Sequence, residues 1–130
     1  MGSSQRAKGA RGELEFARLL ASELGVDALR QGMAQSRDPH AHADVEWPGC
    51  PWWIECKRGA KPNHRAALHQ ARSAVAVNGS ERMPVVLARD DRADAVAVML
   101  LSDWLPMARA FLQFDELLDE MHRLRFPGGE

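Results

Sequence analysis

The residues best suited to chemistry in this sequence are two acids and a lysine, Asp44, Glu55 and Lys57. Two carboxylates that lie close together repel each other, and a lysine, a shared proton or a divalent cation would compensate for that repulsion. Magnesium prefers oxygen ligands and keeps several waters, so one or two carboxylates and a substrate phosphate suffice to bind it. These residues therefore predict a metal-dependent phosphodiesterase centre, while a solvated strand face of mixed charge is the simpler alternative.

A β-hairpin is predicted to bring the three residues together. The segments on either side of residues 48–51 are rich in Val, Ile and Trp, and the turn between them contains Pro and Gly, which is typical of a tight hairpin connection. Looping out those four residues places Asp44 opposite Glu55, where paired Cβ atoms lie about 5 Å apart. Because side chains alternate along a strand, Glu55 and Lys57 share one face and Cys56 points to the other.

Helical and strand periodicities on both sides of this hairpin predict a mixed α/β domain over residues 1–130, with residues 1–9 as a flexible tail. The predicted elements are a helix over 10–24, strands over 26–33, 43–47 and 52–58, a helix over 62–77, strands over 83–88 and 95–101, and helices over 102–111 and 115–124. This order, α-β-β-β-α-β-β-α-α, favours a central mixed sheet flanked by helices. The strands over 83–88 and 95–101 are expected to be buried.

The composition, 45% hydrophobic and 27% charged, is typical of a soluble globular protein. No apolar run approaches the ~20 residues that span a bilayer, and the polar, basic N-terminus lacks the apolar region of a secretory signal. Cys50 and Cys56 are too few for a disulfide framework, which favours a reducing, cytoplasmic setting. The net charge of −1 combines +3 over residues 1–72 with −4 over residues 73–130, so the N-terminal part could present a positive surface to phosphates.

The loop over residues 34–42 holds further candidate ligands. His40 and His42 would lie on one side of an extended segment and could bind a metal. Lining the entrance of the site is their more ordinary role, with His42 facing Lys57 in the predicted register. Asp38 is a competing acid, but it lies outside the predicted strands.

The element order and these residues resemble the PD-(D/E)XK nuclease superfamily, and within it the small Holliday-junction-resolvase-like enzymes of bacteria, archaea and phages. The resemblance covers about residues 8–101. In that family an acidic residue opens the first hairpin strand and Glu-x-Lys lies on the next strand. These positions correspond here to Asp44 and to Glu55-Cys56-Lys57, although the proline that often precedes the aspartate is replaced by Ala43.

A glutamate of the first helix, following a glycine, often joins the site in this family. Lys8-Gly9-Ala10-Arg11-Gly12-Glu13 is similar to that pattern, which points to Glu13, with Glu15 as the second choice. The helix after Glu-x-Lys often contributes a polar residue to the active face, and Gln70 is the best candidate.

The resemblance implies a restriction-endonuclease-like core and a deoxyribonuclease that depends on Mg²⁺ or Mn²⁺. The implied metal ligands are Asp44, Glu55, Glu13 and the backbone carbonyl of Cys56, with Lys57 positioning or activating the attacking water. The implied DNA-binding residues are Arg58, Lys61, Arg65, Gln70 and Arg72.

The resemblance further implies a homodimer that hydrolyses branched DNA such as Holliday junctions, in DNA recombination or repair in a bacterial or phage-infected cell. Two symmetric cuts need two sites, which a two-fold dimer supplies. Trp47, Trp52 and Trp104 are candidate contact residues, although core packing is the more ordinary role of each. The open alternatives are a duplex or nicking nuclease, an exonuclease, and a non-catalytic nucleic-acid-binding protein on the same scaffold.

Overall fold

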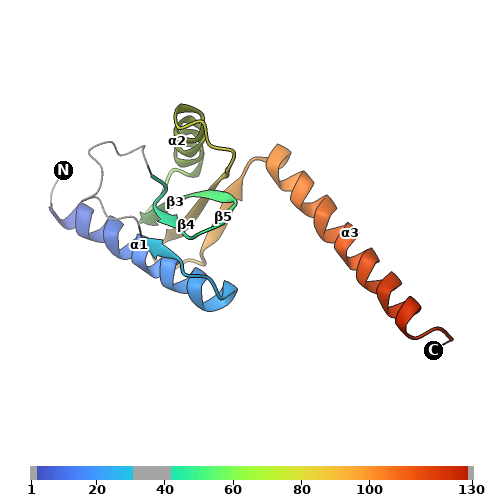
Figure 1. Cartoon of the computed structure of the whole chain (residues 1–130). Helices are drawn as coiled ribbons and strands as arrows, with labels where there is room; N and C mark the ends of the chain where they lie inside the picture. The colour runs from blue at the N-terminus through green and yellow to red at the C-terminus, as the bar shows by residue number, and fades with distance from the viewer. Residues whose placement is uncertain (1–2, 31–41, 129–130) are drawn as a thin grey trace. The chain divides into compact units, whose positions relative to one another are not determined.

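Up to residue 99, the helices and strands follow one another in the order that the periodicities predict. The computed structural model describes residues 3–30 and 42–128. Its elements are α1 (Ser3–Leu24), β1 (Leu29–Arg30), β2 (Val45–Glu46), β3 (Trp52–Gly59), α2 (His64–Val77), β4 (Met83–Asp90), β5 (Val96–Met99) and α3 (Leu101–Arg125) (Figure 1). The chain divides into two compact units, one ending at Met99 and one beginning at Leu100, and each is described by itself.

The strands of the first unit form a mixed sheet in the spatial order β1-β2-β3-β4-β5. The pairs β1–β2, β2–β3 and β4–β5 are antiparallel, whereas β3 and β4 are parallel. Parallel neighbours need a long crossover connection, and α2 supplies it. The mixed α/β class and the predicted order of elements up to β5 are therefore confirmed.

The two helices of this unit cover opposite faces of the sheet (Figure 1). Ala17 of α1 packs with Ile54 of β3, whereas Ala71 of α2 packs with Trp53 of the same strand. Consecutive residues of a strand point to opposite faces, so these two contacts lie on opposite sides of β3. The same alternation places Glu55 on the face that α2 covers.

The predicted hairpin register is confirmed. Val45 of β2 pairs with Ile54 of β3, which is the alignment obtained by looping out residues 48–51. The Trp47 carbonyl accepts a 3.0 Å hydrogen bond from the Cys50 amide and closes the turn. The rings of Trp47 and Trp52 lie 6.2 Å apart between centroids, and both residues belong to the core on the α1 side of the sheet.

The ends of α1 and α2 show why the sequence limits them. α1 begins at Ser3, so residues 3–9 of the expected flexible tail are helical instead, while residues 1–2 lie outside the described residues. No proline interrupts this segment, which continues the helix that follows. α1 ends before Gly25, which adopts a left-handed φ of 65° that suits glycine. α2 begins after Asn63, whose side-chain oxygen accepts a 3.0 Å hydrogen bond from the Ala66 amide, as expected of an N-cap.

The edge strands differ from the prediction. β1 comprises only Leu29–Arg30 of the predicted 26–33, of which 31–33 lie outside the described residues. β5 is shorter than the predicted 95–101 and is not buried, since Val96 is 44% exposed. The apolar composition of β5 predicted burial, but its position at the edge of the sheet leaves part of it open.

The second unit contains one continuous helix, α3, where two helices over 102–111 and 115–124 were predicted. No glycine or proline interrupts the chain between Met107 and Phe126, so nothing in the sequence breaks the helix there. Leu100 occupies the N-cap position, and its side chain makes no capping hydrogen bond. A lone helix has no core of its own, so the division into units leaves the prediction of one domain over residues 1–130 untested. Within the described residues, no helix is both long enough and apolar enough to cross a membrane.

Candidate active site

Asp44 occupies a bend immediately before β2 and ties the start of that strand to β3. Its amide donates a 2.8 Å hydrogen bond to the carbonyl of Ile54, and its carboxylate Oδ2 accepts a 2.8 Å hydrogen bond from the amide of Cys56. β2 begins only at Val45, so the Asp44 side chain takes the place of a strand partner for the Cys56 amide. The amide and the carbonyl of one strand residue point toward the same neighbouring strand. Because the Cys56 amide points toward Asp44, the Cys56 carbonyl points in that direction too.

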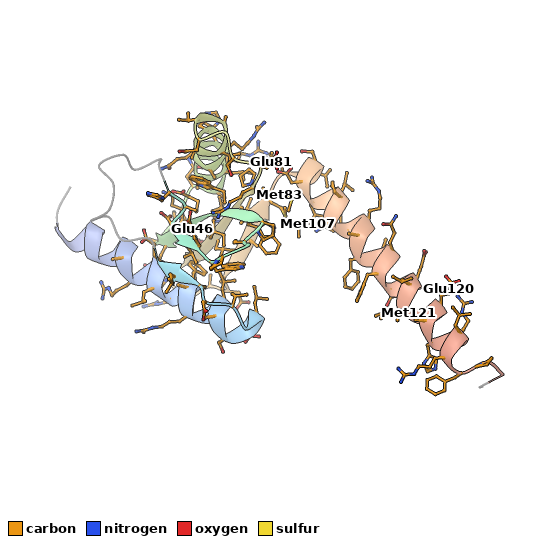
Figure 2. The ribbon with its side chains drawn as sticks, in the orientation of Figure 1. Glu46, Glu81, Met83, Met107, Glu120 and Met121 are labelled. Carbon is orange, nitrogen blue, oxygen red and sulfur yellow. The ribbon has the colours of Figure 1, made fainter. Side chains whose placement is uncertain are left out.

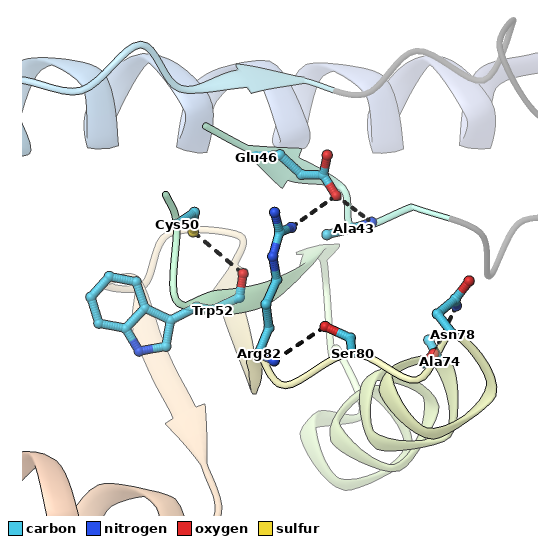
Figure 3. Close-up of polar contacts among 8 residues, drawn as sticks. All are labelled: Ala43, Glu46, Cys50, Trp52, Ala74, Asn78, Ser80 and Arg82. Carbon is cyan, nitrogen blue, oxygen red and sulfur yellow. Dashed lines mark hydrogen bonds and ion pairs between the residues drawn. The ribbon is translucent and has the colours of Figure 1, made fainter. Parts of the chain in front are cut away.

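A polar network fixes the approach of the chain to Asp44 (Figure 3). The Glu46 carboxylate accepts hydrogen bonds from the Ala43 amide at 3.4 Å and from Arg82 Nη1 at 3.1 Å. The Arg82 amide in turn donates a 3.1 Å hydrogen bond to the Ser80 hydroxyl. The residue before Asp44 is thus anchored, through Glu46, to the segment that leads into β4.

Glu55 and Lys57 lie on the α2 side of β3, two residues apart. Glu55 is 8% exposed, whereas the Lys57 side chain is 37% exposed. The Lys57 Nζ atom lies 3.8 Å from Glu55 Oε1, which is an ion pair but too long for a hydrogen bond. A buried carboxylate is therefore paired with an ammonium that still reaches solvent.

Burial and nearby negative charge raise the pKa values of the two acids. Burial raises the pKa of Asp44 to about 7, with a further increase from the charge of Glu55, against the lowering effect of the Cys56 hydrogen bond. Burial also raises the pKa of Glu55, although Lys57 acts in the opposite direction. Two neighbouring acids whose pKa values are both raised are suited to a cation that neutralises them.

Glu13 of α1 belongs to the same electrostatic group. The burial of Asp44 and Glu55 is the main cause of their raised pKa values, and the charge of Glu13 raises both further. Glu15 is instead paired with Arg58 and Arg89. Of the two glutamates considered from the sequence, Glu13 is thus the one whose charge acts on the acids of the hairpin.

The ion pairs of Glu15 hold α1 against the sheet. Arg58 Nε lies 3.1 Å from Glu15 Oε2, and Arg58 Nη1 lies 3.5 Å from Asp91 Oδ1. The helix comes so close to β3 here that a Cβ atom on Gly12 would lie 2.9 Å from the Arg58 Cβ atom. Gly12 directly precedes Glu13, so this contact sets the position of the glutamate.

Sequence reasoning missed this support. Arg89 and Asp91 follow Glu15 by more than seventy residues, and no local pattern connects them. The one usable signal was Gly12, since a glycine inside a helix costs about 1 kcal/mol relative to alanine and usually has a packing reason.

The remaining predicted residues lie in different environments. Lys61, Arg65 and Arg72 are exposed, and Gln70 is half-buried. Lys61 precedes α2, whereas the other three belong to this helix, which covers the Glu55 face of the sheet. Arg58 is engaged in the ion pairs of the α1 contact. His42 is exposed, whereas His40 and Asp38 lie outside the described residues. Burial raises the pKa of the Cys56 thiol, which belongs to the core on the α1 side.

The ligand atoms at this site are carboxylate and carbonyl oxygens. Over residues 3–30 and 42–128, no three His, Cys, Asp or Glu side chains are arranged as a ready-made metal cage. Magnesium does not need one, because it is commonly held by one or two carboxylates with waters and substrate phosphates completing the shell. Asp44, Glu55 and the Cys56 carbonyl are of the chemical type that this cation prefers.

Comparison with known proteins found no family model that matches this sequence and no curated protein similar to it.

Proposed function

We propose that this protein is a divalent-metal-dependent DNA endonuclease with a restriction-endonuclease-like core. The observation that carries the proposal is the pairing of Asp44 and Glu55 beside the partly exposed Lys57. Both acids are mostly buried, and the charge of Glu55 adds to the cost of ionising Asp44. A purely structural hairpin gains nothing from burying two like charges, because doing so lowers its stability. A site that binds a cation and a phosphate accounts for both features.

Asp44, Glu55 and the Cys56 carbonyl would hold Mg²⁺ or Mn²⁺, with Glu13 completing or orienting the shell. When bound, the metal supplies a water of lowered pKa and stabilises negative charge on the scissile phosphate. The hydrogen bond from the Cys56 amide to Asp44 Oδ2 keeps that carboxylate oriented at the edge of β3. The same contact keeps the Cys56 carbonyl and the carboxylate on one side.

Lys57 has two roles in this proposal. Glu55 holds its ammonium at 3.8 Å, so the charge stays on the active face while the side chain remains accessible to substrate. There it donates to the attacking water or to a phosphate oxygen, where negative charge grows during hydrolysis. Replacing Lys57 therefore removes catalysis and leaves the two acids in place.

The substrate that we propose is branched DNA, such as a Holliday junction, cut by a two-fold homodimer in the cytoplasm. Lys61, Arg65 and Arg72 are exposed basic residues that would bind backbone phosphates, with Gln70 beside them on α2. Arg58 has its charge compensated by Glu15 and Asp91, so we assign phosphate binding to the other three. Such contacts give salt-dependent binding with little sequence preference.

A panel of DNA substrates tests the proposal. The protein is incubated with Mg²⁺ and with four-way junction, flap, linear duplex or single-stranded DNA, and Lys57→Ala serves as the control for contaminating nucleases. We expect cutting of the four-way junction by the natural sequence and none by Lys57→Ala. If the protein prefers linear duplex DNA or degrades DNA from its ends, we would assign it duplex endonuclease or exonuclease activity instead of junction cutting. Binding without any cutting in Mg²⁺ or Mn²⁺ would favour a non-catalytic DNA-binding protein.

A further inference from the structure

Taken by itself, α3 presents a large apolar surface. No residue of the helix is buried, and Phe111 and Phe114 are 70% and 58% exposed. The other large apolar side chains exposed over residues 101–126 are Leu101, Trp104, Leu105, Leu112, Leu117, Leu118, Met121, Leu124 and Phe126. Side chains of this size carry roughly 150–250 Å² each, so their exposed halves add up to on the order of 1,000 Å². Monomeric proteins rarely expose more than a few hundred Å² in one patch.

The apolar residues of α3 follow a seven-residue repeat. Alternating steps of three and four residues lead through Trp104, Met107, Phe111, Phe114, Leu118 and Met121. In Figure 2, Met107 lies in the first half of this helix and Met121 in the second. An apolar repeat of 3.5 residues is the pattern with which a helix packs along another helix. The pattern therefore points to a helical partner rather than to a flat surface.

The two halves of the helix differ in side-chain size, because small alanines occur only in the first half. Trp104, Met107, Ala108, Phe111 and Leu112 line a hollow in the first half, with the small Ala108 between larger side chains. Residues spaced by three, four and seven positions form the hole that receives a side chain from a facing helix. The second half carries the large side chains that fit such a hole, Leu117, Leu118 and Met121.

We propose that α3 is a dimerisation surface, which pairs antiparallel with α3 of a second copy of this chain. A two-fold axis between Leu112 and Gln113 sets Phe111 level with Phe114, Met107 with Leu118, and Trp104 with Met121 of the second copy. Every position of the repeat then has an apolar partner, and each hollow receives the large side chains of the other chain's second half. The surface is self-complementary, as a two-fold interface requires.

Charge selects the antiparallel arrangement over the parallel one. Residues 115–120 contain Asp115, Glu116, Asp119 and Glu120, and parallel helices would set this acidic block against itself. In the antiparallel pair the two blocks are offset by about 15 Å along the axis, from a rise of 1.5 Å per residue, which exceeds the Debye length in physiological salt. The antiparallel pair also brings Asp103 of the first turn beside the basic last turn with His122, Arg123 and Arg125.

The area is sufficient for a weak to moderate dimer. Burying about half of the apolar surface of α3 from each copy removes on the order of 1,000 Å² in total, which is near the lower limit for specific interfaces. The proposal deepens the homodimer within the proposed function by naming its surface. Because association is measured without DNA or metal, its result tests the dimer proposal independently of the nuclease activity.

The first test is the association state of the full chain, measured by sedimentation velocity from low to high micromolar concentration. We expect a dimer for the natural sequence, and a dissociation constant raised by at least about thirty-fold in Phe114→Glu, because a charge would be buried at the centre of the interface. Gln113→Glu adds the same charge at the neighbouring position outside the repeat and is expected to leave the dimer intact. A monomer at all concentrations, or equal weakening by the two variants, would overturn the proposal.

The second test determines orientation and does not require a disruptive substitution. Trp104→Cys and Met121→Cys are prepared separately, mixed and oxidised, and non-reducing electrophoresis measures the amount of cross-linked dimer. The natural chain, treated in the same way, controls for cross-linking through Cys50 and Cys56. We expect cross-linking in the mixture above that of either variant alone. Strong cross-linking of Met121→Cys with itself would show a parallel pair, and no cross-linking in the mixture would remove the interface.

Discussion

Asp44→Asn is expected to stabilise the metal-free protein at pH 8 and to abolish catalysis. The asparagine side-chain oxygen can still accept the hydrogen bond from the Cys56 amide, which is 2.8 Å long in the natural chain. The substitution therefore removes the charge while keeping the contact that orients the side chain. What is lost is the repulsion by Glu55 and the penalty for burying a carboxylate.

The magnitude follows from the pKa. Asp44 titrates near 3.8 when unfolded and at about 7 when folded, so between these values the folded state binds more protons and its stability falls as the pH rises. Each pKa unit corresponds to about 1.4 kcal/mol, so the full difference amounts to roughly 4 kcal/mol above pH 7. Below pH 4 the difference between the two proteins should vanish.

Urea unfolding in EDTA at pH 4 and pH 8 measures this difference. Asp27→Asn, which removes the same charge from an exposed position, controls for net charge. We expect the free energy of unfolding of Asp44→Asn to exceed that of the natural sequence by roughly 2–4 kcal/mol at pH 8. At pH 4 the two values should be almost equal. Equal stability at both pH values, or a loss at pH 8, would refute the claim that this carboxylate is held at a cost.

Three further outcomes follow from the contacts. Gly12→Ala should lower the free energy of unfolding and slow cleavage, because the new Cβ atom would lie 2.9 Å from the Arg58 Cβ atom. Gly9→Ala is the control, since its Cβ atom would meet nothing within 4 Å; chemical denaturation should show a free energy of unfolding raised by at most about 1 kcal/mol. Arg72→Gln should weaken DNA binding and reduce the slope of log K against log salt by about 1 in a fluorescence titration; an unchanged slope would exclude a phosphate contact. The Cys56 thiol, whose pKa burial raises, should react with a thiol reagent at neutral pH only after denaturation; rapid reaction in the folded protein would contradict its placement.

The parts of the fold that the sequence predicted correctly depend on short-range chemistry. The Pro-Gly turn and the alternation of side chains set the register of the hairpin, so the pairing of Val45 with Ile54 followed from counting residues. The start of α2 near residues 62–63 was likewise predicted from local sequence, and the side chain of Asn63 accepts a hydrogen bond from the first turn. Both inferences involve residues that are close in sequence.

The parts that could not be predicted depend on contacts between distant segments. The pairing of Glu15 with Arg58 and Arg89 requires α1 to lie on the sheet, and no periodicity encodes which arginine it meets. The exposure of β5 depends on its place at the edge of the sheet, which its apolar composition does not reveal.

Magnesium binding tests the central claim most directly. Isothermal titration calorimetry at neutral pH measures the binding of Mg²⁺ to the natural sequence, to Asp44→Asn and to Glu55→Gln, in two buffers of different ionisation enthalpy. We predict a single class of site in the natural sequence, with proton release because Asp44 is partly protonated near its pKa of about 7, and no binding in either variant. Equal binding heats in all three proteins, or no binding of Mg²⁺ or Mn²⁺ by the natural sequence, would contradict a shared cation between these two acids.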